Sequence, residues 1–141
     1  MFRFYLAHPF ESREAIRAWE LQIEQKHEVE LFNPFYDIAR REIDDIDSGR
    51  RGRYEIDPPT IVHRDFANLA ASDGVLAIID GAISYGAIME MVYANMLGLK
   101  VYAIITNAHE KHPWLVYHSA GIWTSMEGFE MDLAVLLEAI S

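Results

Sequence analysis

Residues 72–105 limit the possible folds of this chain more than any other stretch. They contain two short runs rich in Val and Ile, residues 75–79 and 100–105, separated by a glycine-bearing loop and a helical pattern. Both runs are apolar on each side of the pleat, as in strands buried within a parallel sheet. The segment therefore predicts a strand–helix–strand unit. Ligands of open α/β sheets bind outside the carboxyl ends of the strands, so we expect the functional site at the loop 80–86.

The rest of the chain continues this alternation. Strands are expected at 2–7 and 29–32, with an edge strand at 121–124, and helices follow Ser12 and span 61–71 and 127–140. In the first helix Ile16, Trp19 and Ile23 recur at helical spacing, and the charged residues are expected on the remaining surface: Glu14, Arg17, Glu20, Glu24 and Lys26. The order predicts one domain over residues 1–141, an α/β three-layer sandwich with a parallel, flavodoxin-like or Rossmann-like sheet of four to five strands.

Charge and composition exclude several classes of function. The net charge of −10 argues against a protein that grips a nucleic-acid polymer, which needs a positive surface. The absence of cysteine excludes disulfides and thiol catalysis, and it fits a reducing compartment. No window approaches 18 uninterrupted apolar residues and no signal peptide is visible, so we expect a cytoplasmic protein without a membrane segment.

Two carboxylates lie at unusual positions in the predicted helices. Glu90 shares a helical face with Tyr93 and Ala94, and Asp65 lies four residues from apolar neighbours on both sides. Glu90 can be a partly buried functional carboxylate or an acidic residue that complements the helix dipole. Asp65 can point into the protein or form a surface pair with His63 or Arg64.

Two further segments allow a functional and an ordinary interpretation. Residues 36–59 hold five arginines among several acidic residues and two glycines, which is typical of a solvated loop or of a lid that closes over an anionic substrate. His109 and His112 lie in the segment 106–118, but a His pair without a third ligand is a weak indication of a metal site. We expect a polar loop there and no metal.

The chain lacks the usual markers of dinucleotide binding, P-loop phosphoryl transfer and α/β-hydrolase chemistry. It resembles instead the nucleoside 2-deoxyribosyltransferase family, which includes transferases that exchange bases between 2-deoxyribosides and related hydrolases of nucleoside 5′-monophosphates. The stretches that carry the resemblance are 5–10 (YLAHPF), Asp65, 71–77 (ASDGVLA), 84–90 (SYGAIME) with Tyr93 and Ala94, and 98–101 (GLKV).

The resemblance implies an enzyme that cleaves the N-glycosidic bond without cofactor or metal. Glu90 would be the nucleophile on the anomeric carbon, Tyr5 the phenol that orients it, and Asp65 a contact to the sugar or base. An acid must also protonate the leaving base, and Asp65 is the candidate, provided that its surroundings raise its pKa. The residues that would contact a nucleoside or nucleotide substrate are His8, Phe10, Asp37, Ser84, Gly86 and Ser119. A non-catalytic nucleotide-binding or sensing domain on the same fold is the alternative.

Two observations bear on the subclass and on the assembly. Ser84 stands where transferases of the family typically carry aspartate, as in the nucleotide hydrolases, yet the Gly-rich phosphate loop of those hydrolases has no counterpart after the first strand. Transfer to a second base and hydrolysis therefore stay open. The segment 114–123 is rich in large aromatic and aliphatic side chains, which either cover the sheet edge or form an interface. We expect a homodimer or higher homo-oligomer, in which Ser119 reaches the partner's site as the resemblance implies.

Overall fold

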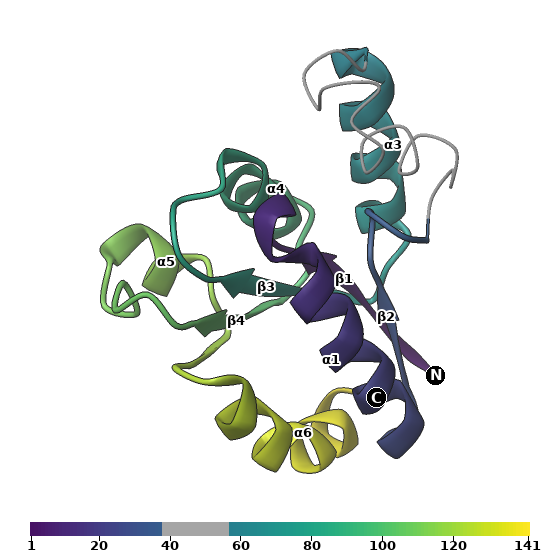
Figure 1. Ribbon diagram of the computed structural model, residues 1–141, viewed down its shortest axis with the longest axis vertical. Helices are drawn as coiled ribbons and strands as arrows, with labels where there is room; N and C mark the ends of the chain where they lie inside the picture. The colour runs from purple at the N-terminus through teal and green to yellow at the C-terminus, as the bar shows by residue number, and fades with distance from the viewer. Residues whose placement is uncertain (38–56) are drawn as a thin grey trace.

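The computed structural model describes residues 1–37 and 57–141, and a five-stranded sheet forms its centre (Figure 1). The strands are β1 (Phe2–Ala7), β2 (Val29–Phe32), β3 (Gly74–Ile79), β4 (Val101–Ile105) and β5 (Gly121–Trp123). Their order is β2-β1-β3-β4-β5, and all four neighbouring pairs are parallel. This is the flavodoxin-like order, and the predicted fold class is confirmed, including the edge strand β5.

Helices cover both faces of the sheet. They are α1 (Arg13–Lys26), α3 (Pro58–Ala70), α4 (Tyr85–Met96), α5 (Pro113–Tyr117) and α6 (Met126–Ile140), with a short 3-10 helix η1 (Phe10–Ser12) before α1. Apolar residues of α3, α4 and α5 pack in one core cluster, and those of α1 and α6 pack in the other. Accordingly, α4 and α6 lie on opposite sides of β3 and β4 (Figure 1). None of the helices in the described parts of the chain is long and apolar enough to cross a membrane.

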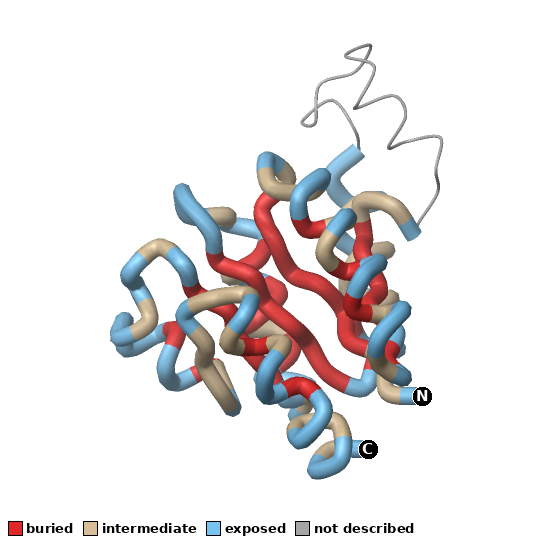
Figure 2. The backbone as a smooth tube through the Cα atoms, turned by 60° about the horizontal axis from the view of Figure 1, so that its bottom comes forward, coloured by how far each residue is buried: buried red, intermediate tan, exposed pale blue. Residues whose placement is uncertain are grey.

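Strand periodicity decides which side chains face which helices. β3 and β4 are buried along their whole length, and they belong to the red segments of Figure 2. Because successive side chains of a strand alternate between faces, Tyr5 and Ala7 of β1 point toward α4, whereas Phe4 and Leu6 point toward α1 and α6. The alternation therefore aims the Tyr5 ring at the helix that carries Glu90.

Two helices differ from the sequence-based expectation. α3 begins at Pro58 rather than at residue 61, because Asp57 caps it by accepting a hydrogen bond from the Thr60 amide. Proline is well suited to the first helical positions, whose amides need no partner. α5 is a single turn inside the segment expected to be a loop, and the His112 side chain caps it. Of the predicted lid, residues 38–56 lie outside the described residues.

The expectation that Glu20 lies on the exposed surface of α1 is wrong. Its side chain is 0 % exposed, and it lies in the buried stripe of the helix between Ile16 and Ile23. The spacing of these three residues puts them on one face of the helix. Polar partners described below, Arg17 and Asn33, make the burial possible.

Candidate active site

The predicted site lies at the carboxyl edge of the sheet. Since all strands are parallel, the loops that follow β1, β2 and β3 leave the sheet at this same edge. The loop after β3 ends at Ser84, whose hydroxyl caps α4 by accepting a hydrogen bond from the Ala87 amide at 3.3 Å. Ser84 and the exposed Gly86 thus lie at the start of the helix that carries Glu90, where its first amides are directed outward.

A buried tyrosine–carboxylate pair lies under this edge. The Tyr5 hydroxyl donates a hydrogen bond to Glu90 Oε2. Tyr5 is 0 % exposed and Glu90 is 9 % exposed, although the two residues are 85 positions apart in the chain. Burial raises the pKa of Tyr5 well above its usual value, and the negative charges of Glu90 and then of Asp65 raise it further. Tyr5 therefore remains a protonated donor at neutral pH.

Asp65 belongs to the same group of side chains. It is half-buried on α3, and its charge acts on the Tyr5 hydroxyl, while the neighbouring Arg64 acts on that hydroxyl in the opposite direction. α3 and α4 are held together here by the stacked rings of Phe66 and Tyr93, whose centroids are 4.1 Å apart. Phe66 follows Asp65 directly, and Tyr93 lies one turn beyond Glu90. The predicted catalytic residues thus come together from β1, α3 and α4.

A second group gathers the predicted substrate contacts of the loops after β1 and β2. His8 is 3 % exposed, and its Nε2 faces Asn33 Oδ1 at 3.1 Å. The rings of His8 and Phe10 both meet Phe35 edge-to-face. Asp37 accepts a hydrogen bond from the Asn33 amide at 2.8 Å. His8, Phe10 and Asp37 are therefore neighbours, joined through Asn33 and Phe35.

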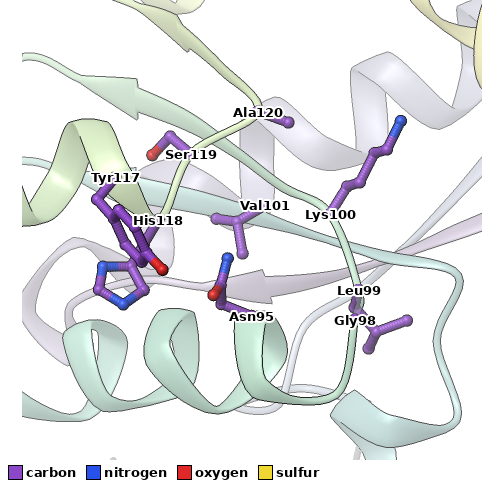
Figure 3. Close-up of a pocket in the computed structure, with 9 residues that line it drawn as sticks. All are labelled: Asn95, Gly98, Leu99, Lys100, Val101, Tyr117, His118, Ser119 and Ala120. Atoms are coloured by element: carbon purple, nitrogen blue, oxygen red, sulfur yellow. The ribbon is translucent and has the colours of Figure 1, made fainter.

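Ser119 is not part of these groups within one chain. Its hydroxyl donates to the Leu115 carbonyl at 2.7 Å, and it lines a pocket of about 260 Å³ beside the amino end of β4 (Figure 3). The pocket also includes Asn95 of α4, together with Tyr117 and His118 at the end of α5. The carboxyl edge with Ser84 lies at the other end of α4. In a single chain, Ser119 therefore faces away from the predicted site.

Three polar residues near the site were not expected from the sequence. The Arg13 guanidinium lies 3.8 Å from the centre of the Phe10 ring, and Arg17 donates to Asp37 at 3.3 Å. Asn33 follows directly after β2. Its place at the carboxyl end of a strand is the sequence feature that indicates a residue near the site. Within residues 1–37 and 57–141, no group of three or more His, Cys, Asp or Glu side chains could hold a metal ion.

The fold and its site define a flavodoxin-like α/β protein with a buried tyrosine–glutamate pair at the carboxyl edge of the sheet. No protein-family model matches the chain, and no curated protein matches it. Among solved structures, it is similar to the Clostridium botulinum CMP N-glycosidase BcmB, with a TM-score of 0.60 and 17% sequence identity. The match covers 95% of this chain and 98% of that one. At this identity, the likeness shows a common fold.

Proposed function

We propose that this protein cleaves the N-glycosidic bond of nucleosides or of nucleoside 5′-monophosphates. The observation that carries the proposal is the hydrogen bond from the buried Tyr5 hydroxyl to the Glu90 carboxylate. A carboxylate held by a phenol that stays protonated is oriented for attack on an electrophilic carbon. The resemblance in sequence and the common fold with a CMP N-glycosidase support the same class of reaction.

The proposed reaction uses the three side chains that the fold brings together. The bond from the anomeric carbon to the base nitrogen breaks through an oxocarbenium-like state, and its electron pair leaves with the base. Asp65 must first take up a proton, because its charged form cannot act as an acid. It then protonates the departing base, while an oxygen of Glu90 forms a bond to the anomeric carbon. Water or a second base then forms the new bond to the anomeric carbon as the bond to Glu90 breaks, and the proton of the attacking group passes back to Asp65. The hydrogen bond from Tyr5 fixes the direction of the attacking carboxylate throughout.

The substrate end of the site favours a 5′-monophosphate. A hydroxyl and outward-facing amides at the start of α4 suit an anion, because the helix dipole favours negative charge at that end. The structurally similar protein is named for CMP, which makes CMP the first substrate to test. Comparison with cytidine and dCMP then separates the contribution of the phosphate from that of the 2′-hydroxyl.

Chromatography of the products tests the proposal directly. The wild type and Glu138→Gln, which changes an exposed carboxylate on α6, should release cytosine from CMP or dCMP at equal rates. Glu90→Gln should lower the rate by about a thousandfold or more, because it removes the nucleophile. A loss of less than about tenfold would contradict the mechanism. Binding of CMP in a calorimeter without release of base from any nucleotide would favour the non-catalytic alternative.

A second copy of the chain is part of the proposal. α4 and α5 expose large uncharged side chains, each between 61% and 80% exposed, namely Ile83 just before α4, Tyr85, Met89, Met96, Trp114 and Tyr117. The one charged residue of α4, Glu90, is buried. Such a surface is typical of a protein interface. A second copy on this face would cover it and would bring Ser119 of the partner subunit toward the site.

A further inference from the structure

Glu20 is a buried carboxyl that the proposed reaction does not use. Its Oε1 accepts hydrogen bonds from Arg17 at 2.8 Å and from the side-chain amide of Asn33 at 3.2 Å. Its Oε2 is also buried and has no hydrogen-bond partner among residues 1–37 and 57–141. A buried acceptor without a partner costs free energy, so this half of the carboxyl is unfavourable for folding.

Asn33 connects Glu20 to two of the predicted substrate contacts. While its side-chain nitrogen donates to Glu20, its side-chain oxygen accepts from the Phe35 amide at 3.0 Å and faces His8 Nε2. Its main-chain amide donates to Asp37. One asparagine thus joins α1, the loop after β1 and the segment after β2. Its side-chain orientation is fixed from both ends, by the Phe35 amide and by Glu20.

Stability alone gives no reason for a carboxyl at this position. The neighbours of Glu20 in the buried stripe, Ile16 and Ile23, are apolar, and an apolar residue between them would need no polar partner. Replacing buried ionic groups by apolar residues of similar size is often neutral or stabilising. Conflicts of this kind between a residue and its surroundings are expected where a protein serves function.

We propose that Glu20 is a positioning residue for the candidate active site, because through Asn33 it holds the His8 loop and Asp37 in place at the carboxyl edge. The inference rests on the proposed function in one respect, since it takes His8 and Asp37 as substrate contacts. Glu20 itself is fully buried under the edge, so we expect it to act through Asn33 and not by contact with the substrate. Its effect is expected on substrate binding more than on the chemical step.

The charge of Glu20 should matter within the physiological pH range. Burial raises the pKa of Glu20 to about 7, against the opposing effects of Arg17 and Asn33, and the nearby negative charge of Asp37 also raises it. His8 faces the network from the loop after β1, and burial lowers its pKa. Above pH 7 the Glu20 carboxylate holds Asn33 and Arg17 more firmly, since hydrogen bonds to a charged acceptor are stronger. Protonation of Glu20 weakens both hydrogen bonds, so that Arg17 interacts mainly with Asp37.

The pH dependence of KM for CMP tests the inference. In the wild type, KM should fall roughly two- to tenfold as the pH rises through 7, the effect of about one hydrogen bond, with a smaller change in kcat. Glu20→Gln keeps the size and one acceptor but cannot titrate, so its KM should lack this step. The control is Glu24→Gln, which removes a carboxylate one turn further along α1 and should keep the step. The same step in Glu20→Gln would overturn the inference.

A second measurement needs no catalytic activity. The side-chain amide resonances of Asn33 should shift with an inflection near pH 7 in the wild type and without one in Glu20→Gln. If the wild type releases no base from any nucleoside or nucleotide tested, the proposed function fails, and this titration alone decides whether Glu20 controls Asn33. Absence of the inflection in the wild type would overturn the inference, even if Glu20→Gln did not fold.

Discussion

The Tyr5–Glu90 pair should be detectable as a coupling free energy, independently of any reaction. Tyr5→Phe deletes one oxygen atom and keeps the ring that stacks on Phe32 with a centroid separation of 6.0 Å. With Glu90 present, we expect a loss of about 1.5–3 kcal/mol in the free energy of unfolding, the range for a hydrogen bond to a charged group. In a chain that also carries Glu90→Gln, the acceptor is neutral, and the same deletion should cost about 0.5–1.5 kcal/mol.

Urea denaturation at pH 8 measures the free energy of unfolding of the wild type, both single variants and the double variant. The coupling free energy is the cost of Tyr5→Phe in the wild type minus its cost in Glu90→Gln. Tyr102→Phe is the matched control. It removes the same atom from a buried tyrosine on the opposite face of the sheet, whose hydroxyl has no hydrogen-bond partner within residues 1–37 and 57–141, and whose pKa burial alone raises. The costs of Tyr102→Phe and Glu90→Gln in free energy of unfolding should add within about 0.5 kcal/mol. Equal costs of Tyr5→Phe in both backgrounds would refute the buried hydrogen bond.

The further predictions concern charge and assembly. Because the pKa of Glu20 rises from 4.5 to about 7 on folding, the folded state retains a proton that the unfolded chain releases, so stability falls as the pH rises between these values. The free energy of unfolding, measured by urea denaturation, should fall by roughly 3 kcal/mol more in the wild type than in Glu20→Gln between pH 4.5 and pH 8. The same pH dependence in both proteins would contradict this prediction. Ser84→Asp should raise KM for CMP and spare cytidine in steady-state assays, because it sets a negative charge against the phosphate, whereas equal losses would exclude a phosphate site there. Light scattering should give at least twice the mass of one 16.2 kDa chain. A mixture of the inactive chains Glu90→Ala and Ser119→Trp should regain part of the activity, because a mixed dimer holds one intact site, and full activity of a monomer would exclude the shared site.

The sheet could be predicted from the sequence because its strands are short, apolar on both sides and separated by helical patterns. Residues 75–79 and 100–105 match β3 and β4 within one residue at each end. Glu90 and Asp65 could be singled out because each interrupts an apolar helical face. The structure brings both close to Tyr5, although their catalytic roles stay predictions.

Long-range polar contacts could not be predicted in the same way. Glu20 looks like any other charge of an amphipathic helix, and its burial depends on Asn33, which lies thirteen residues away after a strand. The stacking of Arg13 on Phe10 likewise depends on the loop geometry, and no periodic pattern in the sequence indicates it. The α5 turn was missed because five residues are too few to show a helical period.

The stacked rings of Phe66 and Tyr93 join α3 to α4 beside the proposed acid and the proposed nucleophile. Leu69 is the only fully buried residue of α3, so this stack is a main attachment of the helix at the level of Asp65. Phe66 is adjacent to Asp65 in the chain, and Tyr93 lies one helical turn from Glu90. A larger side chain at either position should push α3 away from α4 and widen the separation of the two carboxylates without touching either. In N-glycosidic chemistry that separation governs whether a carboxylate or a water molecule attacks the sugar. A substitution at this aromatic contact should therefore be able to change the stereochemistry of the product.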